Sequence, residues 1–200
     1  MTARRTQEQR RTETRSRLLA AAARVFAERG YAAASVGEIV RAAGCSTGAL
    51  YAHFRSKDEV FLALLDQAIP RWGDSYVEQV STEPTLAGQL RAAVRHWAEL
   101  LDQQPQTTML FIEFWSAAMR DPELRGEFAT RHDEVKQAMT TLIVGAAQEL
   151  DIPLDQPPEA LGAIVTALAD GFALQRLANP DSVPDELFIT ALRLLLDRRH

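Results

Sequence analysis

Hydrogen-bond donors gather between residues 47 and 57 of this chain. Tyr51, His53 and Lys57 carry a phenol, an imidazole and an ammonium group, and each can donate a hydrogen bond to a phosphate oxygen. Gly48 and Ala49 come just before them, and their small size lets the main chain approach the edge of a base. These residue types suit a surface that contacts nucleic acid.

The residues around these donors predict two short helices joined by a tight turn. Ser35 and Glu38 have the spacing of a capping box, in which the serine caps a helix and the glutamate reaches back to the cap. Gly44 can take the left-handed conformation that ends a helix. Ser46 can cap the next helix, which we expect to end near residue 54. Two helices separated by a turn of roughly 3–4 residues with a glycine form a helix-turn-helix, whose second helix enters the major groove of DNA.

An alternative is a short amphipathic helix inside an ordinary helical bundle. It explains the caps, because any helix gains from them, but it does not explain the gathering of donors. Leu50 and Phe54 stand four apart and are predicted to face the core. The residues left near the outward face are Thr47, Gly48, Tyr51 and His53.

The charge of the chain is divided between its two ends. The 200 residues carry a formal net charge of −5, which alone argues against a partner that is a polyanion. Residues 1–57 hold 11 Lys and Arg against 4 Glu, a charge of +7, and residues 58–200 hold 11 against 23 acidic residues, a charge of −12. A basic head on an acidic body directs nucleic acid to one end of the molecule.

The same stretch resembles a known family of DNA-binding proteins. GALYAHFRSKDEVFLALLD, residues 48–66, closely resembles the end of the DNA-binding domain of the tetracycline-repressor (TetR) family. Its lead-in, LLAAAARVFAERGYAAASVGEIVRAAG, matches the family pattern at Phe26, Gly30, Tyr31, Val36 and Ile39. The resemblance extends from about Thr14 to Leu65; beyond it, only the helical character and the total length are similar.

The resemblance implies specific roles in DNA binding. Ser46, Thr47 and Gly48 are implied to lie near bases. Tyr51, His53 and Lys57 are implied to contact phosphates, and Ser35 and Arg41 to approach the DNA backbone from the first helix of the pair. Cys45 departs from the pattern, because many relatives have Val or Ile there.

Two features of the head leave alternatives open. Arg4, Arg5, Arg10 and Arg11 precede a helix predicted from Thr12 to Arg29; they form either an arm that enters a minor groove or a solvated tail. Cys45 is the only cysteine, which excludes an intramolecular disulfide. It is either a small buried apolar residue or a thiol whose oxidation disturbs DNA docking.

Proline-centred breaks divide the rest of the chain into further helices, and no alternating strand pattern is present. We predict an all-α protein of about nine helices. A helix-turn-helix DNA-binding domain with a basic arm is predicted at residues 1–56, and a helical effector-binding and dimerisation domain at 57–200. No uninterrupted run of about 18 apolar residues and no signal-peptide core is present. We therefore expect a cytoplasmic protein with no membrane partner.

Residues 107–119, TTMLFIEFWSAAM, are apolar on almost all sides and are predicted to lie at the centre of the body. Glu113, the only charge in this run, lies either on a narrow polar edge or in an effector pocket. His132 falls in an apolar stripe and is either a hydrogen-bonded core histidine or part of that pocket. A small lipophilic or aromatic effector fits a cavity among aromatic rings, and Glu113 would admit a lipophilic cation. The candidate effector-binding residues are Trp72, Trp97, Phe111, Glu113, Trp115, His132 and Phe172.

The last predicted helix has too many apolar residues for one buried stripe. We interpret this as one face packed within the chain and the other on a second copy; a fully internal helix is the alternative. The resemblance implies that this helix and residues 158–178 form a four-helix dimer interface. The predicted dimerisation residues are Phe188, Ala191, Leu192 and Leu195.

The motifs of several enzyme classes are absent. The sequence has no Gly-x-Ser-x-Gly, no phosphate-binding glycine loop and no His-Glu-x-x-His, and we predict no enzyme activity, cofactor or metal site. We predict a ligand-responsive repressor that binds a palindromic operator as a homodimer and is released by a small lipophilic effector. The alternative is a DNA-binding regulator without a small ligand, constitutive or controlled by a protein partner; a fully packed body would favour it.

Overall fold

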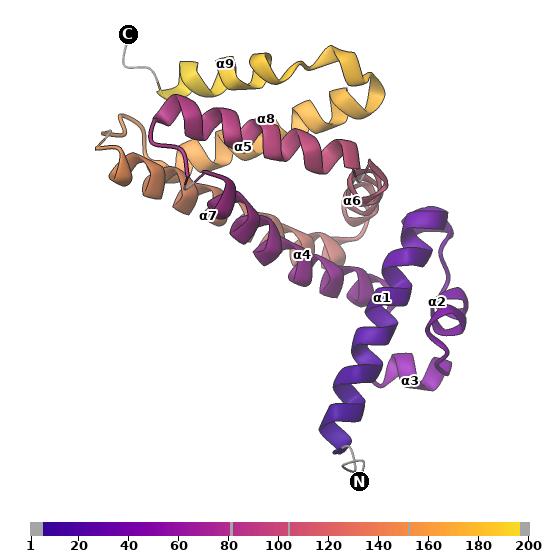
Figure 1. Ribbon diagram of the computed structural model, residues 1–200. Helices are drawn as coiled ribbons and strands as arrows, with labels where there is room; N and C mark the ends of the chain where they lie inside the picture. The colour runs from indigo at the N-terminus through magenta and orange to yellow at the C-terminus, as the bar shows by residue number, and fades with distance from the viewer. Residues whose placement is uncertain (1–5, 81, 104, 152, 197–200) are drawn as a thin grey trace. The chain divides into compact units, whose positions relative to one another are not determined.

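The computed structural model describes residues 6–80, 82–103, 105–151 and 153–196. Within these ranges the chain forms nine α-helices and one short 3₁₀-helix, with no strand, which confirms the all-α prediction. The helices are α1 (Gln7–Ala33), α2 (Val36–Ala43), α3 (Thr47–Tyr51), α4 (Lys57–Val80), α5 (Leu86–Gln103), α6 (Pro105–Ala118), α7 (Pro122–Glu149), α8 (Pro158–Ala178), η1 (Pro180–Ser182) and α9 (Asp185–Leu196) (Figure 1).

The helices form two compact units. The head unit comprises residues up to 67 together with 109–128, and the body unit comprises residues 68–108 together with those from 129 onward. The sequence predicted a boundary between residues 56 and 57, at the start of α4. In the structure the first residues of α4 belong to the compact head unit, where Phe61 on α4 stacks on Phe114 of α6 with ring centroids 4.0 Å apart; the functional boundary stays a prediction.

The first helix begins earlier than predicted. Thr6 caps α1 and forms a capping box with Gln9, so the helix starts at residue 7 rather than at Thr12. Arg10 and Arg11 are therefore exposed helical residues rather than part of a tail. Arg4 and Arg5, the other arginines of the predicted arm, lie outside the described residues.

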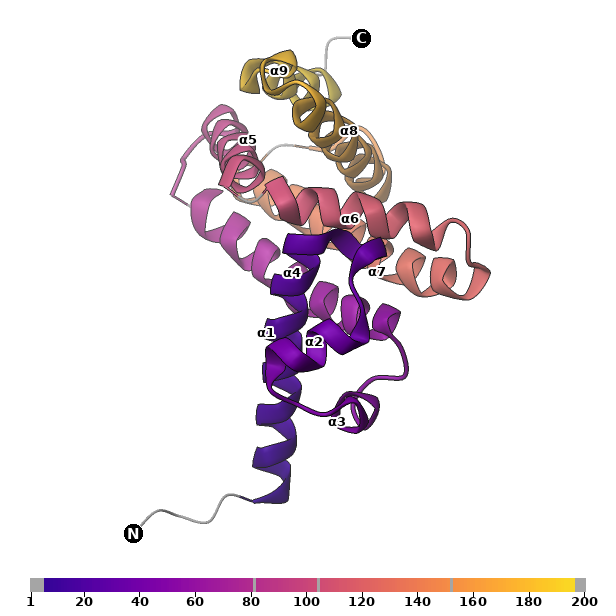
Figure 2. The ribbon, with the colours of Figure 1, turned by 90° about the vertical axis from the view of Figure 1, so that its right-hand side faces the viewer.

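The turn between α2 and α3 follows the predicted pattern. Ser35 and Glu38 form the capping box of α2, and Gly44 ends that helix in the left-handed conformation, with φ 60° and ψ 39°. Ser46 caps α3 by accepting a hydrogen bond of 3.1 Å from the amide of Ala49. Both helices belong to the head unit, and α2 runs beside α1 in both views (Figures 1 and 2). Leu50 of α3 is fully buried, which holds the short helix on this support.

The body unit has a core between α5, α8 and α9. Val94, Phe188, Ile189 and Leu192 form its buried cluster. Arg176, near the end of α8, donates hydrogen bonds to Asp102 at 2.8 Å and to Asp185 at 3.0 Å. Since these carboxylates lie at the end of α5 and the start of α9, this one guanidinium ties three helices together.

Two helices differ from expectation. A break or kink was predicted at Pro70, but α4 continues through residue 70 to Val80. The α6 helix was predicted to be central, and this was wrong: only Phe114 and Ala118 are buried, and Met109 is 54% exposed. Other apolar side chains of α6, among them Leu110, Ile112 and Trp115, are half-buried.

Among the described residues, α8 is the one helix long and apolar enough to cross a membrane by length and composition. This is weak evidence, because core helices of other proteins pass the same test. Within the body unit, Leu161, Gly162, Thr166 and Ala173 of α8 are buried.

Candidate DNA-binding surface and ligand cavity

The start of α3 presents a small, open surface. Ser46, Thr47 and Gly48 are exposed, and a Cβ added to Gly48 would meet only the Ser46 hydroxyl oxygen, at 3.9 Å. Tyr51, one turn later, is 53% exposed. The structure therefore brings together four of the residues predicted to meet DNA on one short helix and its cap.

Ser35 and Arg41, the two predicted backbone contacts of α2, differ in how free their side chains are. The Ser35 hydroxyl donates to the Glu38 carboxylate at 2.8 Å and accepts from the Glu38 amide at 3.2 Å. The hydrogen bonds that the Ser35 hydroxyl and then its amide donate to the carboxylate hold the pKa of Glu38 below its usual range. The amide and the hydroxyl of Ser35 therefore both donate hydrogen bonds to the Glu38 carboxylate as part of the helix cap. Arg41, in contrast, is exposed.

His53 and Lys57 are less open than the start of α3. Partial burial first, and then the charges of Arg11 and Arg15, lower the pKa of His53 below its ordinary value, so the imidazole is neutral at pH 7 in the free protein. The Lys57 ammonium donates to the carbonyl oxygens of Tyr31 at 2.7 Å and Ala34 at 3.0 Å.

The Lys57 ammonium also lies 4.4 Å from the centre of the Tyr31 ring. In this geometry Lys57 joins the start of α4 to the end of α1, and a phosphate contact would have to replace some of these hydrogen bonds. Its predicted contact with DNA stays a prediction, and the structure adds a positioning role that the sequence did not indicate.

Arg17 is a further residue that the sequence analysis missed. Its guanidinium donates to the carbonyl oxygens of Ala43 at 2.6 Å and Gly44 at 3.0 Å, the last carbonyls of α2. A cation at this end of a helix is favourable because the helix leaves its carbonyl groups without partners there. Arg17 therefore fixes the turn between α2 and α3; its distance of 26 residues from Ala43 gave no local signal.

Cys45 lies in the same turn and is half-buried. Its thiol donates to the Ala43 carbonyl oxygen at 3.6 Å. A half-buried position fits a small apolar residue, and the oxidation of this thiol stays a prediction.

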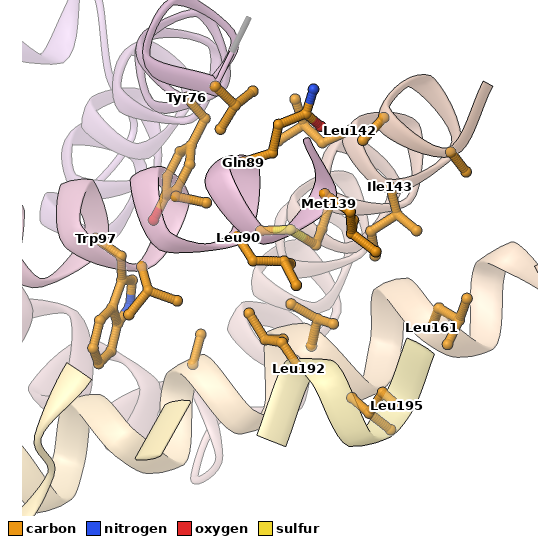
Figure 3. A pocket seen from close by; sticks show the side chains of 18 of the residues that line it. Tyr76, Gln89, Leu90, Trp97, Met139, Leu142, Ile143, Leu161, Leu192 and Leu195 are labelled. Atoms are coloured by element: carbon orange, nitrogen blue, oxygen red, sulfur yellow. The ribbon is translucent and has the colours of Figure 1, made fainter. Parts of the chain in front are cut away.

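A cavity of about 140 Å³ lies in the body unit. Side chains of α4, α5, α7, α8 and α9 line it, among them Tyr76, Trp97, Met139 and Leu192 (Figure 3). The lining is aliphatic and aromatic and includes no acidic or basic side chain. Tyr76 and Gln89 supply most of its polar character, and burial raises the pKa of the Tyr76 phenol, which is therefore neutral.

Of the predicted effector-binding residues, Trp97 lines the cavity. The Trp72 side chain lies outside the described residues. Phe111 and Trp115 belong to the head unit, where they pack on Phe128 with ring centroids 5.5 Å and 5.4 Å apart. Phe172 packs on Phe188 at 4.9 Å and stands behind the lining. These three rings pack on other aromatic residues, which a sequence cannot show, and a role for them in effector binding stays a prediction.

The two predicted polar members of the pocket have other partners. The ring of His132 is hydrogen-bonded to Asp170 at 3.2 Å and does not line the cavity. Glu113 is in the head unit, where its carboxylate accepts a hydrogen bond of 2.6 Å from the Tyr31 amide. The suggestion that the effector is a lipophilic cation is therefore not supported by this cavity, because its lining carries no negative charge.

Glu113 acts at a break in α1. Gly30 has φ 76° and ψ 163° inside the run that ends at Ala33, a conformation open almost only to glycine. The break removes the Tyr31 amide from the helical hydrogen-bond pattern, and the Glu113 carboxylate accepts its hydrogen bond instead. The Tyr31 hydroxyl is hydrogen-bonded to Asp58 at the start of α4, and burial, followed by the hydrogen bond and charge of Asp58, raises the pKa of this phenol.

Gly30→Ala is expected to lower the free energy of unfolding by about 2–4 kcal/mol. An alanine there is strained by about 1–3 kcal/mol, and its Cβ would lie 2.8 Å from both Glu113 carboxylate oxygens, so the carboxylate must leave the Tyr31 amide. Urea unfolding measures the change. Gly145→Ala in α7 is the control, because a Cβ there meets nothing within 4 Å; equal midpoints for the two variants would refute this account of Gly30.

The predicted dimerisation residues mostly face their own unit. Phe188 and Leu192 are 3% and 6% exposed, and both line the cavity together with Leu195; Ala191 is half-buried. Phe188, Leu192 and Leu195 therefore contact their own unit, and their part in dimerisation stays a prediction. Apolar side chains that do reach the surface of α8 and α9 are Ile164 (41%), Leu174 (50%), Leu187 (46%) and Leu194 (70%).

Two models of known protein families match different parts of this chain. Residues 18–64 match the model of bacterial regulatory proteins of the tetR family, and residues 86–200 match that of the C-terminal part of BetI-type transcriptional repressors. The HTH-type transcriptional regulator Mb2936c of Mycobacterium bovis is 31% identical over 195 residues, which cover 96% of this chain and 97% of that protein.

Two further proteins show how far the similarity extends. The HTH-type transcriptional activator FasR of Mycolicibacterium smegmatis is 32% identical over 133 residues, 66% of this chain and 60% of that protein. The crystal structure of FadR from Bacillus subtilis in complex with stearoyl-CoA has the same fold, with a TM-score of 0.71 and 18% identity over 92% of this chain and 99% of that one. The chain belongs to the tetracycline-repressor (TetR) family of bacterial transcriptional regulators, which are DNA-binding proteins and not enzymes.

Proposed function

We propose that this chain is a ligand-responsive repressor that binds a palindromic DNA operator as a homodimer and is released by a small lipophilic effector. Residues 1–56 bind DNA and residues 57–200 bind the effector and the second copy. The match of residues 86–200 to BetI-type repressors supports repression. The similarity to bacterial regulators of transcription supports a cytoplasmic location.

The cavity of the body unit is the observation that carries the effector part of the proposal. A regulator that needs no ligand gains nothing from an apolar pocket of about 140 Å³, because apolar side chains are more stable when they are packed than when they face an unfilled space. FadR, which shares the fold, was crystallised with stearoyl-CoA, a molecule with a long acyl chain. That neighbour supports a lipophilic ligand for the fold, although it is too distant to name one for this chain.

The exposed start of α3 supports the DNA-binding part. Its cap and first residues, Ser46, Thr47 and Gly48, are open, while Leu50 anchors the helix from below. The two-fold symmetry of a dimer would place two such helices in successive major grooves, with half-sites about 34–36 Å apart or a multiple of that distance.

One helix connects the two activities along the chain. The first residues of α4 hold Lys57 and Asp58, which bind the end of α1, and its last turns hold Tyr76 and Val80, which line the cavity. A ligand that favours a different position of α4 therefore favours a different spacing of the two heads in the dimer. It releases DNA only if it binds the DNA-incompetent state more tightly, by about 10⁴-fold for a complete shift from 1:99 to 99:1.

Selection of binding sites from a random DNA pool tests the proposal, and we expect a palindromic consensus. Arg41→Ala should then lower the slope of log affinity against log salt by about 0.9, because one phosphate contact is lost. Tyr51→Phe should weaken binding to operator and to random DNA equally, since phosphates carry no sequence information. Arg91→Ala, an exposed arginine on α5, is the control and should leave the slope unchanged. A selection without any consensus would refute the proposed function.

A further inference from the structure

Gln89 carries the one side-chain amide in the cavity lining. It lies on α5 between Leu86 and Leu90, which also line the cavity, and it is 5% exposed. Among the described residues, its Oε1 is the one buried side-chain oxygen or nitrogen without a hydrogen-bond partner. Such an atom is costly, because it has left water and gained no replacement.

The geometry fixes which end of the amide is unsatisfied. The Gln89 Nε2 donates to the carbonyl oxygen of Glu83 at 3.2 Å. A main-chain carbonyl can only accept, so the atom that faces it must be the nitrogen, and the other atom must be the oxygen. Figure 3 shows the oxygen on the side of Leu142, another lining residue, and the nitrogen turned away from it. Gln89 is thus a lining residue whose amide oxygen is an acceptor without a donor among the described residues.

The rest of the lining limits the charge of a ligand. The lining has no acidic or basic side chain, and the pKa of the Tyr76 phenol is raised by burial. A carboxylate, phosphate or ammonium group would enter an apolar space without a counter-charge, which is strongly unfavourable. An apolar body is favoured by the remaining side chains, which are aliphatic or aromatic.

The size of the cavity limits the ligand further. Its volume is about 140 Å³, and one water-sized group occupies on the order of 10–15 Å³ of such volume. About ten groups of that size therefore fit without rearrangement.

We infer that the effector is an uncharged, largely apolar molecule of this size with a single hydrogen-bond donor, an alcohol or phenol, which donates to Gln89 Oε1. The inference rests on the proposed function in taking the cavity as the effector site, and it adds the chemical class of the effector. The hydroxyl satisfies the orphaned oxygen, and the apolar body fills the space between α5, α7 and α9.

Binding of four ten-carbon probes to the purified full-length protein tests the inference. The probes are 1-decanol, its isomer methyl nonyl ether, decanoate and decylammonium, measured by calorimetry. Decanol and the ether have the same atoms and nearly the same apolar surface, but only decanol has a donor. We expect decanol to bind roughly tenfold more tightly than the ether, the effect of about one hydrogen bond, and both ions to bind more weakly than decanol.

Gln89→Leu is expected to remove the preference for decanol over the ether. Gln89→Met, which keeps the length of the side chain, should do the same, and Gln137→Leu, at an exposed position of α7, should leave the preference intact. Equal binding of decanol and the ether to the wild type overturns the inference and needs no variant. Tighter binding of either ion also overturns it.

Operator release separates this inference from the function on which it rests. Selective binding of decanol through Gln89, without any effect on the operator complex, would support the ligand class and refute the effector role. Release of the operator by decanol and the ether alike, at equal affinity, would support the effector role and refute the selection by Gln89. Absence of binding by all four probes would refute both.

Discussion

Gly48→Val is expected to abolish specific DNA binding and to leave the protein folded. In the free protein a Cβ at Gly48 meets only the Ser46 hydroxyl oxygen, at 3.9 Å, so the isopropyl group projects into solvent and changes stability little. In the proposed complex it occupies the space where the start of α3 meets the base edges. Loss of base contacts removes the difference between operator and random DNA, which is about 10³-fold or more in specific complexes.

Gly37→Val is a closely matched control. Gly37 and Gly48 are each the second residue after a capping serine, both are exposed, and a Cβ at Gly37 likewise meets only a capping serine oxygen, at 3.9 Å. We expect Gly37→Val to keep most of its operator preference in a fluorescence anisotropy titration against operator and scrambled DNA. Normal operator binding by Gly48→Val would show that α3 is not the helix that reads the sequence.

Replacement of Leu187 and Leu194 together by glutamate is expected to give folded monomers. These two residues are 46% and 70% exposed on α9, so the charges enter water in a single chain but would be buried in a dimer that uses this face. A monomer reaches only one half-site. Because each base pair lost from a site costs about 1–3 kcal/mol, operator affinity should fall by at least about 100-fold.

Leu192→Glu separates packing from assembly. Leu192 is 6% exposed and lines the cavity, so a carboxylate there is buried inside one chain and should unfold the body unit. Sedimentation gives the oligomeric state of both variants, and circular dichroism gives their folding. A double variant at Leu187 and Leu194 that sediments as a folded dimer at micromolar concentration would place the interface elsewhere.

The parts of the head that could be predicted depend on neighbours in the sequence. Ser35 with Glu38, Ser46 with Ala49 and the left-handed Gly44 act within four residues of one another, so their residue types are sufficient evidence. The bond from Tyr31 to Glu113 spans 82 residues. No local pattern contains this hydrogen bond, so the sequence indicated only a polar edge or a pocket for Glu113.

The cavity was harder to predict than the DNA-binding surface. Gln89 and His132 give the same signal, a polar residue in an apolar helical stripe, and only His132 was chosen. In the structure the His132 ring is hydrogen-bonded to Asp170, whereas Gln89 Oε1 has no hydrogen-bond partner. The ninth helix was likewise understood as apolar on two sides, but only the packing of Phe188 and Leu192 into the cavity wall shows which side is internal.

The two segments of the head unit are synthesised at different times, which affects when this unit can fold. Its residues end at 67 and resume at 109–128, and Phe114, which is fully buried, covers the rings of Phe61 and Tyr31. A ribosome adds about 5–20 residues per second, so the roughly 60 residues from 67 to 128 take about 3–12 seconds. During that interval the nascent head has exposed aromatic rings and no acceptor from Glu113 for the Tyr31 amide. Proteolysis within residues 6–67 should therefore be faster in a nascent chain stalled before residue 109 than in one stalled after residue 128 has emerged.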